Sequence, residues 1–307
     1  MFERSDMGFD LAKFNISVQT TEPALLVSWF QRCGKLFSTL CREAACRKNH
    51  SDTGFCCNDT SCDWLQIFGQ KLTEDESALR RYQKPPLPFA FYFREGESRK
   101  EIVECELVIA GRAIIHSRLI LNSFIKLCKI CNDHHIPCLI VSIETADSHG
   151  NRHILGSEDI FLSDTENLTL ISSDELTDIA GYVNSEITVR LFTPLCTRSD
   201  GHFMRRFDFA SFSGAVMRRV TSIAYYYGAT EFSSDFREIS VKARKAACVG
   251  FHFERADGRD GIFSGITGYG TFIGDFSGLM PFLHLGSFLN AGRGAAYGMG
   301  KFMILTD

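Results

Sequence analysis

The sequence predicts an α+β protein of two tandem ferredoxin-like (RRM-like) domains, with a cysteine-rich insertion in the first domain. Strand-like and helix-like apolar patterns follow one another in β-α-β order in residues 14–143, and again after residue 187. A chain of 307 residues also has the length of about two domains. We expect an N-terminal domain at 1–165 with the insertion at 41–68, an acidic linker at 166–186 and a C-terminal domain at 187–307.

The composition is that of an ordinary globular protein. Hydrophobic residues make up 45% of the chain and charged residues 23%. No apolar run approaches the roughly 20 residues needed to cross a membrane, and the start, MFERSDMGFD, lacks the basic-then-apolar order of a signal peptide. With 12 cysteines and no export signal, we expect a cytoplasmic protein whose cysteines are core residues or metal ligands.

The net charge of −4 is concentrated in one segment. Residues 155–185 contain no Lys or Arg but seven acids. The part of the chain before this segment carries 19 basic and 19 acidic residues, and the part after it carries 14 and 11. Both domains can therefore present basic faces, and the net charge does not exclude an RNA partner.

The first domain is predicted to begin with a strand and a helix. Residues 14–18 alternate between apolar and polar, as a half-buried strand does. The helical pattern that follows has Trp29, Cys33, Leu36 and Leu40 on one face and Arg32 and Lys35 on the other. Further strands are expected at 90–93, 102–110 and 137–144, with a helix after Gly111. Cys128 and Cys131, at the end of this helix, are expected to be buried thiols rather than half of a metal site.

A cysteine-dense segment follows the first helix. Its cysteines are Cys41, Cys46, Cys56, Cys57 and Cys62. Four converging thiolates are what tetrahedral zinc requires, and such a site stabilises a small insertion that has no core of its own. We therefore expect a structural zinc held by Cys41, Cys46, Cys57 and Cys62, with Cys56 or His50 as alternatives to Cys57. The competing interpretation is a set of free thiols.

The second domain is predicted to open with a strand, a basic loop and a helix. The strand is 187–195, and Asp208 can cap a helix whose apolar residues recur at helical spacing up to Gly228. Arg218 and Arg219 are expected on the other side of this helix. The loop between strand and helix places His202 among three arginines, which are Arg198, Arg205 and Arg206.

The chain ends in a glycine-rich stretch, residues 285–301, reading LGSFLNAGRGAAYGMGK. Glycine lets the backbone N–H groups of a loop approach a ligand closely, because no Cβ stands in the way. Such a loop suits a phosphate-bearing partner, and the residues expected to contact it are Gly292, Arg293, Gly294, Gly298, Gly300 and Lys301. The alternative is a glycine-rich hairpin with no particular function.

These C-terminal segments resemble the signature of the RAMP superfamily, and in particular the CRISPR-associated endoribonucleases that process precursor CRISPR RNA. In that family a strand G-x-x-G-x-x-x-(Y/F) leads to a helix L-P-x-L-x-L-G and a loop G-(K/R)-x-x-x-x-G-x-G. The matching pieces are 265–272, 279–286 and 292–300. The resemblance covers nearly all of residues 187–307 and, more loosely, 14–143. The cysteine segment also resembles a four-cysteine insertion found in the family.

The resemblance implies binding and cutting of CRISPR repeat RNA, the precursor stem-loop. A ribose hydroxyl attacks the adjacent phosphate and leaves a cyclic phosphate, and no catalytic metal is expected. The helix position at which the family commonly has its catalytic histidine is Ser38 here. We therefore expect His202 and Arg205 to be catalytic. The other expected RNA contacts are Arg32, Lys35, Arg198, Arg206, Arg218 and Arg219.

Two rival functions remain open at this level. One is a subunit of a CRISPR effector complex that holds the repeat without cutting it, which the serine at position 38 permits. The other is a zinc-stabilised assembly protein whose glycine loop grips another subunit. Neither the composition nor the motifs indicate a membrane partner.

Overall fold

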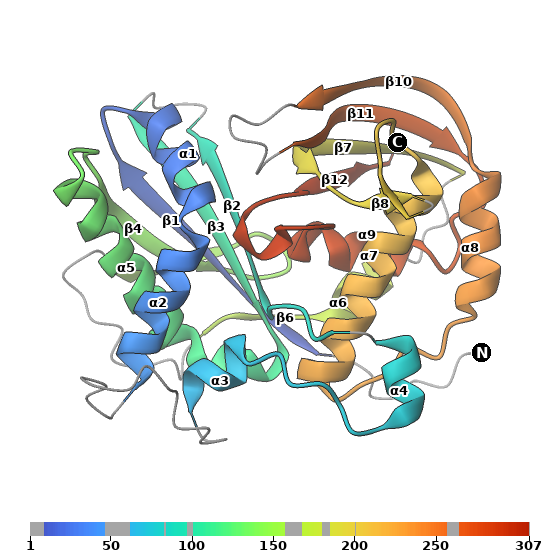
Figure 1. Cartoon of the computed structure of the whole chain (residues 1–307). Coiled ribbons are helices and arrows are strands. Elements are labelled where there is room, and N and C mark those ends of the chain that lie inside the picture. Colours follow the sequence, from blue (N-terminus) through green and yellow to red (C-terminus); the bar gives the residue numbers. More distant parts are fainter. Residues whose placement is uncertain are drawn as a thin grey trace. The chain divides into compact units, whose positions relative to one another are not determined.

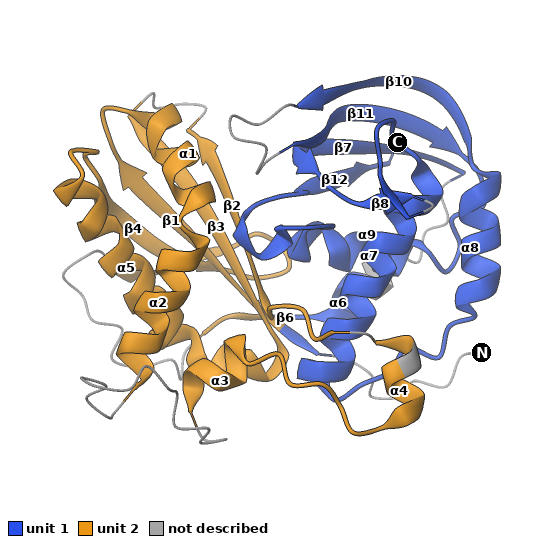
Figure 2. Ribbon diagram, in the orientation of Figure 1, with its two compact units in different colours: residues 1–10, 171–307 blue, residues 11–170 orange. Residues whose placement is uncertain are grey.

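The computed structural model describes residues 9–46, 62–82, 84–96, 101–156, 168–179, 185–199, 201–256 and 264–306. The chain divides into two compact units (Figure 2): residues 11–170, here called the N-terminal unit, and residues 1–10 with 171–307, the C-terminal unit. Within the described ranges, no helix is long and apolar enough to span a membrane.

The N-terminal unit contains an antiparallel sheet with the strand order β2-β3-β1-β4-β5. Its strands are β1 (Asp10–Gln19), β2 (Phe89–Glu95), β3 (Ile102–Ala110), β4 (Leu139–Ala146) and β5 (Arg152–Gly156). Helices lie between β1 and β2 and between β3 and β4. This is the β-α-β-β-α-β succession of ferredoxin-like domains, with β5 added at one edge.

The helices of this unit are α1 (Pro23–Arg32), α2 (Gly34–Ala45), α3 (Asp63–Phe68), α4 (Glu76–Arg81), the 3-10 helix η1 (Gly111–His116) and α5 (Ser117–Asp133). The single helix expected around residue 33 is wrong, because the chain turns at Cys33 and two helices form. The break changes the phase of the helical pattern. Of the predicted face only Leu40 is buried, whereas Trp29, Cys33 and Leu36 are partly exposed. The other buried residues of the two helices are Leu26, Phe30, Phe37 and Cys41.

Phenylalanine rings fill the core between the helices and the sheet of the N-terminal unit. Phe30 stacks on Phe93 with ring centroids 5.1 Å apart, and Phe124 stacks on Phe91 at 5.6 Å. Figure 1 shows α1, α2 and α5 on one face of this sheet. The predicted burial of the Cys128 and Cys131 thiols is confirmed, since both side chains are almost fully buried.

The C-terminal unit repeats the same succession. Its sheet has the order β10-β11-β7-β12 with antiparallel neighbours, and its strands are β7 (Glu186–Leu195), β10 (Ala247–Ala256), β11 (Gly265–Ile273) and β12 (Phe302–Leu305). Helix α7 (Phe209–Ile223), continued by the π-helix η3 (Ala224–Gly228), and α8 (Phe236–Lys245) lie between β7 and β10. Helix α9 (Met280–Leu289) lies between β11 and β12. The molecule is thus an α+β protein with two antiparallel sheets.

Local chemistry explains the ends of α7 and its packing against α9. The Asp208 carboxylate accepts a hydrogen bond from the Ser211 N–H at 2.8 Å, which confirms the predicted cap. A Cβ on Gly286 would collide with the Val216 side chain, so α9 approaches α7 as closely as it does only with glycine there. Phe212 of α7 meets Phe302 of β12 edge to face at 4.9 Å and joins both helices to the sheet.

The predicted linker and insertion are described only in part. Residues 157–167, 180–184 and 47–61 lie outside the described residues, and with them most of the cysteine segment. The described part of 166–186 contains β6 (Leu170–Ser172) and α6 (Ser173–Ile179). Asp174 and Glu175 occupy the first turn of α6, where acidic side chains favour a helix N-terminus.

Candidate nucleic-acid interface

A two-stranded hairpin projects its polar side chains just before α7. It consists of β8 (Arg198–Ser199) and β9 (His202–Phe203), and Gly201 takes the positive φ of +81° that the turn requires. The Arg198 guanidinium lies 5.3 Å from the centroid of the Phe203 ring. His202 is exposed. The predicted loop is therefore an ordered ribbon that presents a histidine and an arginine to solvent.

Arg205 and Arg206 follow the hairpin directly. Both side chains are exposed, and within the described residues neither takes part in an ion pair. The acid nearest to them in sequence, Asp208, holds the first turn of α7 through its cap. The two guanidinium groups are therefore available to an anionic ligand.

The two arginines predicted on the outer side of α7 have different environments. Arg218 is exposed and extends over Gly214. Arg219 is partly buried, and its Nε donates to the Leu289 carbonyl oxygen at 2.7 Å, at the end of α9. Burial lowers the pKa of the Arg219 guanidinium to about 10, so it remains charged at neutral pH.

The expectation that Arg219 lies on the outer side of α7 is therefore wrong, and its contact with RNA stays a prediction. One residue of an α-helix turns its side chain by about 100°, and this step moves Arg219 from solvent to the neighbouring helix. Its charge instead binds a carbonyl at the C-terminus of α9, where the helix dipole favours a cation.

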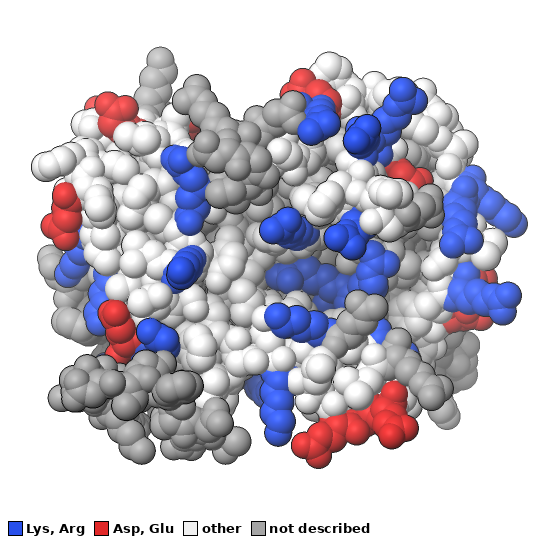
Figure 3. Space-filling model, in the orientation of Figure 1, with Lys and Arg blue, Asp and Glu red and all other residues white. Residues whose placement is uncertain are grey.

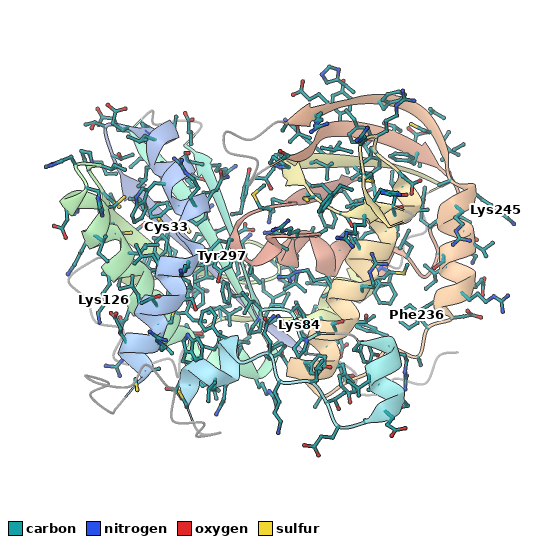
Figure 4. All side chains as sticks on the ribbon, in the orientation of Figure 1. Cys33, Lys84, Lys126, Phe236, Lys245 and Tyr297 are labelled. Atoms are coloured by element: carbon teal, nitrogen blue, oxygen red, sulfur yellow. The ribbon has the colours of Figure 1, made fainter. Side chains whose placement is uncertain are left out.

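The glycine-rich loop joins α9 to β12 through the 3-10 helix η4 (Ala295–Tyr297), whose Tyr297 is labelled in Figure 4. Positive φ angles occur at Asn290, Gly292, Gly294, Gly298 and Gly300. Several of the loop N–H groups are used internally. The Arg293 N–H donates to the Cys196 carbonyl at 2.8 Å, and the Gly300 N–H donates to the Pro194 carbonyl at 3.1 Å. The expectation of a loop that offers its N–H groups to phosphate is therefore wrong for these donors.

The loop glycines are required for close packing. A Cβ on Gly292 would lie 2.5 Å from the Cys196 carbonyl oxygen, and one on Gly300 would collide with the Ala291 carbonyl oxygen. Lys301 is also buried, and its Nζ donates to the Ser287 carbonyl oxygen at 3.0 Å, so it is not the phosphate contact we expected.

Arg293 is the exposed cation of this loop. Its side chain takes part in no ion pair within the described residues. The Arg293 N–H donates a hydrogen bond to the Cys196 carbonyl oxygen, just after the end of β7. Arg198 and the hairpin begin two residues after Cys196. Two segments almost 100 residues apart in sequence therefore form one basic surface of the C-terminal unit. Figure 3 shows Lys and Arg side chains gathered over the segments that Figure 1 labels α7, α9 and β8.

The two predicted RNA contacts of the N-terminal unit, Arg32 and Lys35, are exposed. Arg32, on α1, donates from its Nη2 to the Ser28 hydroxyl at 2.9 Å, and Lys35 on α2 is exposed. Ser38 is partly buried on α2, and its carbonyl oxygen accepts the Trp64 indole N–H at 3.0 Å. Nothing around Ser38 within the described residues supplies the base that a serine would need to act as a nucleophile.

Two other histidines have packed environments. His116 is buried, with Nε2 3.0 Å from Gln66 Oε1 and Nδ1 3.6 Å from Asp63. Burial lowers the pKa of His116, although Asp63 opposes this shift. Burial also lowers the pKa of His284, on α9. His202 is exposed by contrast.

The predicted zinc ligands are divided between the core and the margin of the insertion. Cys41 is fully buried on α2, and burial raises the pKa of its thiol to about 11. The thiol is enclosed in the core of the unit, where it lies beside Ser123 of α5. Cys46 ends α2 and Cys62 precedes α3, whereas Cys57 lies outside the described residues. The described part of the chain contains no cluster of three metal-ligating side chains.

Comparisons with known proteins find family models for both units. A family model described as CRISPR-associated endoribonuclease Cas6 matches residues 189–302, which include the hairpin, α7 and the glycine-rich loop. A second family model, AF_1859_N, described as an N-terminal domain, matches residues 9–169. No curated protein matches the sequence.

Solved structures share the fold over almost the entire chain. The Cas6 protein TTHB231, solved as a product complex, is 14% identical with a TM-score of 0.55, over 96% of this chain and 100% of that one. The Cas6 protein TTHA0078 in a substrate mimic complex is 13% identical with a TM-score of 0.51, over 96% and 99%. A chain of a partial Cas6-RT-Cas1–Cas2 complex is 10% identical with a TM-score of 0.56, over 97% and 46%.

The two family models together account for both units, and these structures show the same arrangement of two antiparallel sheets. Residues 189–302 thus match the Cas6 family of CRISPR-associated endoribonucleases, and the solved Cas6 proteins share the fold of the chain.

Proposed function

We propose that this protein binds the stem-loop of a CRISPR repeat and cuts it to release mature CRISPR RNAs. The observation that carries the proposal is the hydrogen bond of 2.8 Å from Arg293 to Cys196, which brings the exposed arginine of the glycine-rich loop to the base of the His202 hairpin. A polyanion that lies along this surface meets Arg198, Arg206, Arg218 and Arg293 together.

The chemistry is a transesterification within the RNA strand. The ribose 2′-hydroxyl attacks the adjacent phosphorus, the bond to the 5′-oxygen of the next nucleotide breaks, and a cyclic phosphate remains. One group must take the hydroxyl proton, another must protonate the leaving oxygen, and cations must stabilise the charge of the phosphorane. In this proposal His202 transfers a proton and Arg205 stabilises the negative charge, and the exposure of both side chains supports these roles.

Arg219 and Lys301 support the site from within. Arg219 fixes the C-terminus of α9, and Lys301 bonds the same helix at Ser287. Arg32 and Lys35 of the N-terminal unit remain proposed as further phosphate contacts. No step of this reaction needs a metal ion.

The test is cleavage of the cognate repeat by the full chain in EDTA. We expect cutting at one position and products that carry a cyclic phosphate and a free 5′-hydroxyl. A wild-type protein that binds the stem-loop but leaves it intact would contradict the cleaving function.

A second candidate function has one specific observation in its favour. Ser38 occupies the position of the family's usual histidine and has no activating neighbour within the described residues. This favours a subunit that holds the repeat without cutting it. The same EDTA assay separates the two functions, because only the cleaving protein yields shortened RNA. Association with other Cas subunits stays a proposal and would be measured by co-purification.

The structural zinc also stays a proposal. Cys46 follows α2 and Cys62 precedes α3, so a zinc ion bound by both would join the two ends of residues 47–61. Cys41 is buried in the core and is less suited to this site. Metal analysis of the purified chain should find about one zinc per chain. Protein of full stability without metal would contradict the site.

A further inference from the structure

The C-terminal sheet has one face that α7 and α9 do not cover. Figure 1 shows both helices on the same side of β10, β11, β7 and β12. Side chains alternate between the two faces along each strand. Val189 and Leu191 of β7 are buried on the helix side, so Arg190 and Phe192 lie on the opposite face. This face is called the open face below.

One row of side chains crosses all four strands on the open face. In the register, His252 of β10 is opposite Tyr269 of β11, Tyr269 is opposite Arg190 of β7, and Arg190 is opposite Met303 of β12. The Tyr269 side chain is 49% exposed, and its ring centroid lies 6.0 Å from that of His252. The Arg190 guanidinium lies 5.0 Å from the centroid of the Phe192 ring.

The charge on this row is positive and uncompensated. Arg190 is exposed and takes part in no ion pair within the described residues. The acid nearest to the row in the register is Glu254, two pairs further along on the same face, opposite Thr267. On the other side of the row, the Thr188 and Thr271 hydroxyls lie 2.7 Å apart and add polar groups to the same face.

This combination suits unpaired nucleotides. Bases that are free of a duplex stack on exposed aromatic rings and on guanidinium planes, and a cation beside the ring attracts the phosphates. Tyr269 and Phe192 stand on β11 and β7, the two central strands of a four-stranded sheet. RRM domains carry their base-stacking aromatic residues on a sheet of the same number of strands.

We propose that the open face binds single-stranded RNA, with a base stacked on exposed Tyr269 and Arg190, held against Phe192, on the adjacent phosphate. The inference rests on the proposed function in one respect: the strand bound here would be the unpaired part of the repeat RNA. Exposed Met303 and Leu305 at the β12 edge would instead suit a protein partner, but a guanidinium that has no acidic partner in the described part of the chain favours a polyanion.

The test uses the full chain and a short fluorescein-labelled oligouridine, with binding followed by fluorescence anisotropy at two salt concentrations. Tyr269→Ala should weaken binding on the order of tenfold, and Tyr269→Phe should bind nearly as the wild type does, because stacking needs only the ring. Arg190→Gln should weaken binding and reduce the slope of log affinity against log salt by about one.

The matched control is Tyr92→Ala. Tyr92 lies on the corresponding face of the N-terminal sheet, opposite Glu106, which is paired with Lys13. Circular dichroism verifies that each variant is folded. We expect Tyr92→Ala to bind oligouridine as the wild type does. Equal affinity of Tyr269→Ala and Tyr92→Ala, or no binding by the wild type, would overturn the inference, and a protein-docking role of the β12 edge would then be favoured.

Cleavage of the repeat stem-loop by the wild type, measured in parallel, separates this inference from the proposed function. Oligouridine binding that depends on Tyr269, in a protein that never cuts the repeat, refutes the cutting alone. If the wild type cuts the repeat normally but Tyr269→Ala leaves the affinity for oligouridine unchanged, the open-face site alone is refuted.

Discussion

The two units share one strand order but present opposite chemistry on the open faces of their sheets. In the N-terminal sheet three basic side chains are paired with acids. Lys13 Nζ lies 2.7 Å from Glu106, Arg94 Nε donates to Glu104 at 2.8 Å, and Arg152 lies 3.4 Å from Glu144. In the C-terminal unit Arg190, on the corresponding face, has an aromatic ring as its neighbour instead of a carboxylate.

The difference shows that the fold does not assign the function. Both units supply helices packed on one face of a sheet. The side chains decide whether the basic groups of the other face are paired with acids or can bind an anion. The exposed arginines of the basic hairpin and the glycine-rich loop also belong to the C-terminal unit. We therefore expect substitutions in the two units to have unlike consequences, which five comparisons can test.

The largest effect is expected from a glycine of the terminal loop. Gly300 has a φ of +64°, and a Cβ there would meet the Ala291 carbonyl oxygen. Gly300→Ala should lower the free energy of unfolding by about 3 kcal/mol or more, from backbone strain and collision together. Gly150 of the N-terminal unit has a φ of +84° but open space around it, so Gly150→Ala should cost only about 1 kcal/mol.

Urea unfolding followed by circular dichroism measures both glycine variants. Trp29 and Trp64, the two tryptophans of the chain, lie in the N-terminal unit, so their fluorescence reports that unit separately. Equal midpoints for the two variants would show that the loop relaxes around the added methyl group.

Catalysis should depend on the hairpin histidine. His202→Ala should slow repeat cleavage on the order of a hundredfold, because proton transfer is lost, while affinity for the repeat stays nearly unchanged. The control is His153→Ala, an exposed histidine on β5 of the N-terminal unit, which should cut at the wild-type rate. Single-turnover rates measure both, and a wild-type rate for His202→Ala would place the proton transfer elsewhere.

Adjacent arginines on α7 should separate stability from binding. Arg219→Ala removes the partner of the Leu289 carbonyl and should lower the free energy of unfolding by about 2 kcal/mol. Arg218→Ala should leave stability within about 0.5 kcal/mol, since its side chain is exposed. Thermal unfolding of the pair decides. If the two variants unfold at the same temperature, Arg219 contributes no more to stability than an exposed residue does.

Unpaired and paired arginines should differ in their effect on RNA affinity. Arg293→Ala should weaken binding of the repeat and reduce its salt slope by about one, as loss of a phosphate contact does. Arg152→Ala, in which the lost charge was paired with Glu144, should change neither quantity measurably. Filter binding at several salt concentrations compares them, and an unchanged slope for Arg293→Ala would remove the loop from the RNA site.

The smallest effect is expected on the N-terminal sheet. Glu106→Gln breaks the ion pair with Lys13, whose side chains are 18% and 23% exposed. The loss should stay below about 1 kcal/mol and shrink at high salt, because partly exposed pairs are screened. A loss of several kcal/mol in urea unfolding would show that the pair holds the sheet together.

Local patterns were enough to predict much of the fold. Strand alternation and helical spacing depend on neighbouring residues, so they indicated an α+β chain with two successive β-α-β units, the cap at Asp208 and the burial of Cys128 and Cys131. The break at Cys33 was missed because apolar residues continue through it, and a single turn changes which of them face the core.

The sequence by itself determined which residue types this protein carries in each segment: a histidine among arginines before α7, glycines around Arg293, and cysteines in the first domain. Only the tertiary structure decided what those residues do. Whether an N–H meets a phosphate or the Cys196 carbonyl, and whether an arginine faces water or the end of α9, depends on partners about 70 to 100 residues away. Such contacts leave no periodic signal in the chain, because they arise only when whole elements pack together.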